Sequence, residues 1–177
     1  GAADTARGLY ESALARERAL TERAGAATLA ELRATADRFE AVVYEHIPER
    51  GGRVVKMIGD EVMFAVDDGA FAADIAVALV EAHARHGDLP AVRVGLARGP
   101  TLSWEGDLFG PTVNLASRLV NFARPDTVLV SDGLGEALRD DPRFELRHLR
   151  PVTLKGIGRV RPWALRRARC PRVGRGR

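Results

Sequence analysis

Two short runs of β-forming residues, 53–58 and 62–66, flank the sequence Gly59-Asp60-Glu61. Both runs are rich in valine and other residues that favour strands, and glycine next to aspartate is typical of a tight turn. Two strand patterns joined by so short a connection predict a β-hairpin. Asp60 is therefore expected at the tip of a rigid pair of strands.

The rest of the chain alternates helix and strand patterns around this hairpin. Apolar residues at steps of three and four predict an amphipathic helix at 28–49 and a buried helix at 70–86. Pro111 suits the first turn of a third helix that ends near Ala123, and Asp132 opens a short fourth helix. This order predicts an α+β fold, a mostly antiparallel sheet with helices packed on one face. The remaining strand patterns are 91–97, 128–130, 144–155 and 160–167, with a glycine-rich arm at 99–110.

Length and composition agree with a single globular domain. The chain has 177 residues, of which 46% are apolar and 29% are charged. No apolar run approaches the roughly 20 residues that span a bilayer, and the first residues lack a signal-peptide pattern. The single cysteine, Cys170, excludes an internal disulfide and fits a reducing compartment. We therefore expect a cytoplasmic protein without a transmembrane segment.

Charge is distributed unevenly along the chain. Six of the 27 basic residues, and none of the 24 acidic ones, lie in the last twelve positions, so the remainder is mildly acidic. A basic end that contains proline and glycine is typical of a disordered tail, which we place at 168–177. Nucleic acid is therefore not an expected partner. Residues 4–24 are highly charged with scattered leucines and predict an exposed, linker-like helix.

Three short patterns could carry chemistry, although each also occurs without a function. Asp60 on a hairpin tip could hold Mg²⁺, which prefers oxygen ligands, yet Gly-Asp is also an ordinary turn. Asn114 and Arg118, one turn apart on the third helix, could hold an anion and a hydroxyl, or they could simply face solvent. Lys155 beside glycines suits a phosphate but is common in hairpins. Only two of the 27 basic residues are lysines, Lys56 and Lys155. Either a compact cation is needed at these two positions, or the distribution is due to chance.

Together and in this order, the patterns resemble the catalytic domain of class III adenylyl cyclases. VVKMIGDEVM is similar to the metal and purine hairpin of that family, GDLFGPTVNLASR to its arm and catalytic helix, and LKGIGRVRPWAL to its closing segment. The similarity extends from about Leu20 to Leu165. It implies a catalytic domain at 20–167 with the family's ferredoxin-like βαββαβ core. Residues 1–19 would then be an N-terminal linker helix or a truncated regulatory segment.

The resemblance also implies how a substrate would be bound. Lys56 and Asp107 match the pair that reads the ring nitrogen and the amino group of adenine, which implies ATP rather than GTP. Lys155 matches the cation that holds the terminal phosphates. Both lysines of the chain therefore fall on motif positions.

For the reaction itself, Asn114 matches the residue that orients the ribose, and Arg118 the one that stabilises the charged transition state. Asp60 matches one of two metal-binding aspartates, and the implied cofactors are two Mg²⁺ or Mn²⁺ ions. The implied reaction is in-line attack of the ribose 3′-oxygen on the α-phosphate, which gives 3′,5′-cyclic AMP and pyrophosphate. Because metal and purine residues of the family meet across a head-to-tail dimer, we expect a homodimer, with an N-terminal regulatory domain outside this chain.

One departure concerns the second metal aspartate. The family has a strand with Phe-x-Asp-x-x-Gly-Phe-Thr before a segment like LTERAG, but here GLYESALARERA precedes that segment, without an aspartate or a strand pattern. We expect this strand to be missing from the sequence rather than from the protein, because a sheet without it would expose unpaired backbone edges. Two consecutive Cα atoms between Tyr10 and Thr21 would then lie much farther apart than ~3.8 Å.

Three other functions remain as alternatives. A catalytically silent cyclase-homology module, which binds nucleotide or a partner as a regulatory dimer, is favoured by the absent aspartate and opposed by the other motif residues. A guanylyl cyclase is disfavoured by Lys56 and Asp107. A diguanylate cyclase is disfavoured because its Gly-Gly-Asp/Glu-Glu-Phe signature does not occur.

Overall fold

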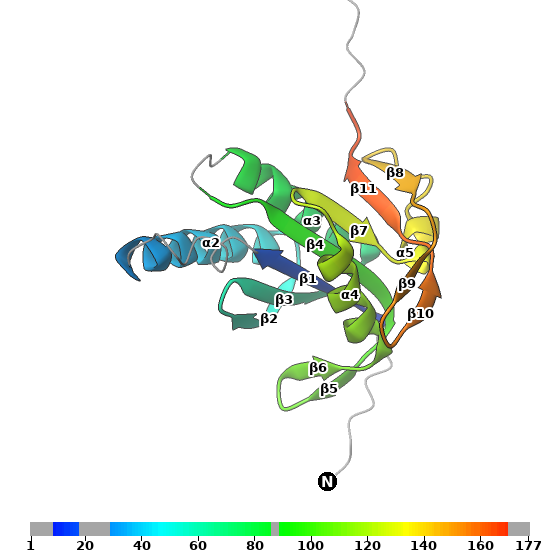
Figure 1. Cartoon of the computed structure of the whole chain (residues 1–177), viewed down its shortest axis with the longest axis horizontal. Coiled ribbons are helices and arrows are strands. Elements are labelled where there is room, and N and C mark those ends of the chain that lie inside the picture. Colours follow the sequence, from blue (N-terminus) through cyan, green and yellow to red (C-terminus); the bar gives the residue numbers. More distant parts are fainter. Residues whose placement is uncertain (1–8, 18–28, 86–88, 170–177) are drawn as a thin grey trace, which may run out of the picture.

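The computed structural model describes residues 9–17, 29–85 and 89–169. A seven-stranded sheet forms its centre, and two small hairpins project from it (Figure 1). Neighbouring strands of the large sheet are antiparallel except β4 and β7, so the predicted α+β class is confirmed. In order across the large sheet, the strands are β2 (Arg53–Ile58), β3 (Glu61–Val66), β1 (Leu9–Glu17), β4 (Val92–Pro100), β7 (Thr127–Val130), β11 (Trp163–Arg167) and β8 (Phe144–His148). The hairpins are β5 (Leu102–Trp104) with β6 (Asp107–Phe109), and β9 (Val152–Leu154) with β10 (Gly158–Val160).

Helices cover both faces of the large sheet, so the prediction of helices on one face is wrong. Alternate residues of β3 point to different cores: Phe64 packs with α2 and α3, whereas Met63 packs with the arm and α4. Every residue of β3 from Val62 to Val66 is buried, and a strand buried on both faces needs cover on both. The helices are α2 (Leu29–Glu49), α3 (Gly69–Arg85), α4 (Pro111–Phe122) and α5 (Asp132–Ala137). None of the helices in the described part of the chain has the length and apolar character that crossing a membrane requires.

The predicted linker helix at 4–24 is wrong for the residues that form β1. Leu9–Glu17 is a strand in the middle of the sheet, antiparallel to β3 on one side and to β4 on the other. Alanine, leucine, arginine and glutamate favour a helix locally, but this strand satisfies the backbone groups of two neighbours that would otherwise be unpaired. Residues 10–17 belong to one uninterrupted strand, and residues 18–28 lie outside the described residues, so the expected omission stays a prediction.

Two prolines divide the C-terminal strands that the sequence predicts as single runs. Between β8 and β9 the chain passes Pro151, and between β10 and β11 it passes Pro162. Because proline has no amide hydrogen to donate to a ladder, each run changes sheets there. The first half of each run pairs differently from the second: β8 pairs with β11, and β9 with β10. Residues 170–177 of the predicted tail lie outside the described residues.

Gly95 of β4 brings α4 into close contact with the sheet. A Cβ atom at this position would lie 2.5 Å from the carbonyl oxygen of Ala116 and 2.7 Å from the backbone nitrogen of Val120. Both atoms belong to the backbone of α4, which cannot rotate away as a flexible side chain can. A side chain at Gly95 would therefore push α4 off β4 and β1.

We expect Gly95→Ala to lower the free energy of unfolding by about 1–3 kcal/mol, because it overpacks a rigid contact. Urea unfolding followed by circular dichroism measures this change. Gly133→Ala in α5 is the matched control, since a Cβ there has no neighbour within 4 Å, and its effect should stay within about 0.5 kcal/mol. Equal stability of the two variants would contradict the close contact between α4 and β4.

Candidate active site

Lys56 and Asp107, 51 residues apart in sequence, form an ion pair. The Lys56 Nζ donates a hydrogen bond to Oδ2 of Asp107 at 2.5 Å, and Oδ1 accepts the amide hydrogen of Leu108 at 2.8 Å. The side chains of Lys56 and Asp107 are 37% and 27% exposed, so both remain accessible to a bound molecule. One cation and one carboxylate thus lie side by side at the surface, where a donor and an acceptor can be presented together.

Two local backbone features place this pair. The register of β2 against β3 shifts between Val54 and Lys56, and such a bulge changes the direction in which a strand presents its side chains. On the arm, Trp104 pairs with Asp107 across a two-residue turn in which Glu105 and Gly106 both have positive φ. Turns of this kind match the twist of a hairpin, and they fix Asp107 as the first residue of β6.

Hydrogen bonding determines the protonation state of Asp107. The hydrogen bond from Lys56 is the main reason why the pKa of Asp107 lies below its ordinary value, and the Leu108 amide adds to this effect. Partial burial of the carboxylate acts in the opposite direction. Asp107 is therefore a carboxylate, an acceptor only, throughout the neutral range.

Asp60 occupies the tip of the β2–β3 hairpin, as predicted. Ile58 pairs with Glu61, so Gly59 and Asp60 form a two-residue turn, and Gly59 adopts the positive φ of 60° that the turn requires. The Asp60 side chain is half-buried. Within the described residues it has neither a hydrogen bond nor an ion pair, which leaves its oxygens available to a ligand.

Asn114 and Arg118 lie on α4, which begins at Pro111 as predicted. Both side chains are exposed, and they are one helical turn apart, so they share a face. The adjoining face of the helix carries Leu115 and the fully buried Leu119, which pack in a separate apolar cluster with β7 and the C-terminal hairpin. Packing therefore holds one side of α4, and the polar pair points away from it.

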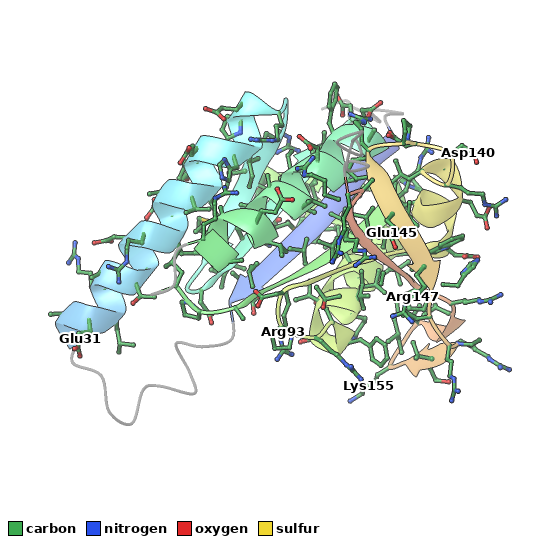
Figure 2. All side chains as sticks on the ribbon, turned by 90° about the horizontal axis from the view of Figure 1, so that it is seen from above. Glu31, Arg93, Asp140, Glu145, Arg147 and Lys155 are labelled. Atoms are coloured by element: carbon green, nitrogen blue, oxygen red, sulfur yellow. The ribbon has the colours of Figure 1, made fainter. Side chains whose placement is uncertain are left out.

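Lys155 lies in the turn between β9 and β10, with Gly156 at a positive φ of 78°. Its side chain is exposed and extends outward from the molecule (Figure 2). Among the described residues, no side-chain hydrogen bond or ion pair joins the predicted site residues to one another, apart from the ion pair of Lys56 with Asp107. A single chain thus brings two of the six residues into contact.

The second metal aspartate has no counterpart in β1. The acidic residues of this strand are Glu11 and Glu17, and Glu17 is its last residue. Arg16 of β1 pairs with Glu61, which directly follows Asp60 in the chain. The carboxyl end of β1 therefore reaches the turn that carries Asp60, with a glutamate rather than an aspartate at that end.

A different group could also attract a cation. Single ligand atoms of Asp132, Glu136 and His148 lie within 4.8 Å of one another. Asp132 already accepts the indole N–H of Trp163 at 2.9 Å, and Glu136 forms an ion pair with Arg139. Both carboxylates therefore already use part of their hydrogen-bonding capacity on protein partners. The group is also separate from the predicted metal site, because it does not include Asp60.

Sequence reasoning missed the apolar surface of the arm. Leu102, Trp104 and Phe109 are 58%, 61% and 46% exposed, although apolar side chains of this size usually become buried. The arm carries them on a hairpin that projects from the sheet (Figure 1). The sequence did contain a signal for this surface, because three large apolar residues occur in a short glycine-rich segment. A hairpin of that length has no core of its own in which to bury them.

The chain belongs to the adenylate and guanylate cyclase catalytic domain family, whose sequence profile matches residues 17–167. It is 39% identical to an adenylate cyclase of Streptomyces coelicolor over 163 residues, which is 77% of this chain and 43% of that protein. It is also 39% identical to an adenylate cyclase of Glutamicibacter nicotianae over 146 residues, or 82% of this chain and 36% of that one. A pH-sensitive adenylate cyclase of Mycobacterium tuberculosis is 41% identical over 126 residues, covering 69% of this chain and 32% of its own length. The chain thus spans less than half the length of these relatives.

Solved structures show the same fold. The catalytic core of a rhodopsin-guanylyl cyclase with converted specificity, in complex with ATPαS, has a TM-score of 0.83 at 20% identity and covers 92% of this chain and 97% of its own. The adenylyl cyclase CyaB from P. aeruginosa has a TM-score of 0.79 at 18% identity, with 92% and 95% covered. A non-canonical dimeric guanylyl cyclase domain of the RhoGC fusion protein from Blastocladiella emersonii has a TM-score of 0.80 at 18% identity, with 92% and 98% covered.

Replacing Lys56 by methionine should raise the pKa of Asp107 toward its ordinary value, because it removes the main hydrogen bond to the carboxylate. NMR titration of the labelled Asp107 carboxyl carbon measures this directly. Lys155→Met, which removes an exposed lysine elsewhere, should leave the titration unchanged. The wild-type pair contributes stability above the ordinary pKa of aspartate and loses it as the pH falls, by on the order of 1 kcal/mol or less. Identical titrations in both variants would contradict the ion pair.

Proposed function

We propose that this domain is the catalytic part of an adenylyl cyclase, which converts ATP to 3′,5′-cyclic AMP and pyrophosphate. The contact between Lys56 and Asp107 is the observation that carries the proposal. Adenine presents a ring nitrogen that accepts a hydrogen bond beside an amino group that donates one. A lysine ammonium and an aspartate carboxylate complement these two groups. Guanine presents a donor and an acceptor in the reverse order, which would leave the lysine, the carboxylate and the groups of the base without hydrogen-bond partners in the complex.

The remaining residues would act on the ribose and the phosphates. The side-chain amide of Asn114 would orient the ribose, and the guanidinium of Arg118 would stabilise the charge that develops at the α-phosphate. Lys155 would hold the terminal phosphates, for which its exposure at a glycine-flanked turn leaves it accessible. The 3′-oxygen then forms the new bond to the α-phosphorus, the bond to pyrophosphate breaks, and the hydroxyl proton passes to solvent or to the leaving group.

The donor set fits a divalent ion. Asp60 is a half-buried carboxylate that has no protein partner within the described residues, and Mg²⁺ is commonly held by one or two carboxylates plus substrate phosphates. When bound, Mg²⁺ or Mn²⁺ would lower the pKa of the ribose hydroxyl and neutralise charge on the attacking and leaving oxygens. A pair of ions needs a second carboxylate. By the position of its backbone at the end of β1, Glu17 is the residue we propose for that role.

We further propose that the active unit is a homodimer. The exposed apolar residues of the arm, Leu102, Trp104 and Phe109, would be covered by a second subunit, which removes their unfavourable contact with water. Asp60 would then serve the same ATP as Lys56, Asp107 and the α4 pair of the partner. A shared site would account for the absence, within the described residues, of any hydrogen bond or ion pair between Asp60 and these side chains.

A silent regulatory module is the second candidate, and the absence of an aspartate from β1 favours it. Such a module would bind ATP without turning it over. Incubation of the protein with ATP and either Mg²⁺ or Mn²⁺ separates the two functions. Formation of cyclic AMP supports the enzyme, whereas saturable ATP binding without cyclic AMP supports the silent module.

Substrate choice tests the adenine assignment. We expect Lys56→Glu with Asp107→Cys to lower kcat/KM for ATP by at least about a hundredfold, because a site built on hydrogen bonds rejects a mismatched base. The melting temperature should change little, since both positions are at the surface. Unchanged ATP kinetics in this double variant would overturn the assignment.

Mixing inactive variants tests the shared site. Asp60→Ala and Arg118→Ala should each abolish activity, but a heterodimer of the two has one intact site. Random subunit exchange should therefore restore about a quarter of the wild-type activity. As a control, mixing Asp60→Ala with the Asp60→Ala, Arg118→Ala double variant should restore nothing. Equal failure of both mixtures would rule out sites shared between subunits.

The arm tests the proposed dimer. Trp104→Ser should raise the dimer dissociation constant roughly thirtyfold, as expected for loss of a central aromatic contact of about 2 kcal/mol. Phe71→Ser is the matched control, because Phe71 is also exposed, by 51%, but lies on α3. Sedimentation velocity over a dilution series measures both. The same dissociation constant in the two variants would mean that the arm is not the interface.

A further inference from the structure

A cavity of about 500 Å³ lies between α4, the first residues of α5 and the β9–β10 hairpin. These elements lie next to one another beside the large sheet (Figure 1). None of the six predicted site residues lines the cavity. Its volume is in the range of sites that bind small molecules, which is roughly 300–1,000 Å³.

One wall of the cavity is apolar. Leu115 and Leu119 come from the packed face of α4, and Val160 comes from β10, with prolines at either end of the hairpin completing the wall. A surface of this kind favours the apolar part of a ligand over water. It does not by itself select a charge.

Arginines determine the charge of the opening. Arg98, Arg159 and Arg161 line the cavity, and among the described residues Asp132 is the one acidic residue that lines it; its Oδ1 accepts the indole N–H of Trp163. Arg159 and Arg161 are exposed, and neither has a hydrogen bond or ion pair within the described part of the chain. Two guanidinium groups without a protein partner, close to an apolar wall, provide fork-shaped donors for a carboxylate or phosphate.

We propose that this cavity binds an amphipathic anion, a molecule with an apolar body and a single carboxylate or phosphate head. The body lies against Leu115 and Val160, and the head is held by Arg159 and Arg161. A purely apolar molecule would leave the guanidinium charges uncompensated, and a small inorganic anion would leave the apolar wall in contact with water. Both parts of the ligand are therefore needed for affinity.

Occupancy of the cavity would also link two parts of the candidate active site. Its apolar wall belongs to α4, whose adjoining face carries Asn114 and Arg118. Arg159 belongs to β10 and Arg161 follows it, directly after the turn that carries Lys155. A ligand that contacts both elements restrains their relative motion, which makes the cavity a regulatory site separate from the substrate.

Isothermal titration calorimetry with decanoate, below its micellar concentration, tests the site on the whole chain. We expect the dissociation constant to rise at least about tenfold in Arg159→Gln, Arg161→Gln, because the charge-assisted hydrogen bonds are lost. The matched control, Arg85→Gln, Arg124→Gln, removes two exposed arginines that do not line the cavity and should stay within about twofold of wild type. Decan-1-ol should bind at least about tenfold more weakly than decanoate. Equal decanoate affinity in both double variants would overturn the proposal.

Two further measurements distinguish the cavity from other surfaces. Val160→Trp, which fills the cavity and keeps both arginines, should also weaken decanoate binding at least about tenfold if the body enters it. Displacement of decanoate by a non-cyclisable ATP analogue would overturn a separate site, because the arginines would then belong to the substrate. Unaltered binding in Val160→Trp would overturn the cavity as the location.

Hydrogen exchange tests the link to α4 independently of catalysis. Saturating decanoate should slow amide exchange in α4 and in the turn at Lys155 at least about threefold in the wild type and not in Arg159→Gln, Arg161→Gln. Unchanged exchange with decanoate bound would overturn the link and leave the binding site. The effect on kcat for cyclic AMP formation rests on the proposed function, so failure of the enzyme assay alone would count against that function and not against the cavity.

Discussion

The structure depends on the pairing of β1 between β3 and β4. This strand is antiparallel to both neighbours, so it satisfies the backbone donors and acceptors of two strands at once. α3 packs on one face of these strands and α4 on the other, and Gly95 of β4 sets how closely α4 approaches. The position of the hairpin that carries Asp60, and of the helix that carries Arg118, therefore follows from a strand whose own sequence favours a helix.

The ion pair of Lys56 with Asp107 is better explained by recognition than by stability. Pairs at the protein surface contribute on the order of 1 kcal/mol or less, yet this pair is held by a bulge in β2 and by a two-residue turn with two positive φ values. In the proposed complex, adenine would replace one ion pair by two hydrogen bonds in fixed geometry. Replacing the ion pair by these hydrogen bonds adds little affinity for adenine. A base with the reverse pattern of donor and acceptor would form neither hydrogen bond. The arrangement thus favours selectivity over binding strength.

The metal side of the site differs in character from the purine side. Asp60 is fixed by a two-residue turn, whereas the strand beside it ends in a glutamate, whose side chain is one methylene longer than that of aspartate. A longer side chain has one more rotatable bond to order when it binds an ion, and that ordering costs free energy. In the proposed enzyme, binding of the ion would outweigh the free energy needed to order this side chain. In the proposed silent module it would not.

Local patterns in the sequence determined the hairpin with Asp60 at its tip, the start of α4 at Pro111 and the shared face of Asn114 and Arg118. These features depend on contacts within a few residues, such as turn conformation and helical spacing. The sequence predicted β1 incorrectly, because its strand depends on backbone pairing with residues about fifty and eighty positions away, which no local propensity records. Only the tertiary structure brought Lys56 to Asp107, placed α4 on the face opposite α3, and gathered Arg98, Arg159 and Arg161 around one cavity. Each of these results depends on the paired sheet, since the residues concerned lie on different elements and meet only when the strands between them are paired.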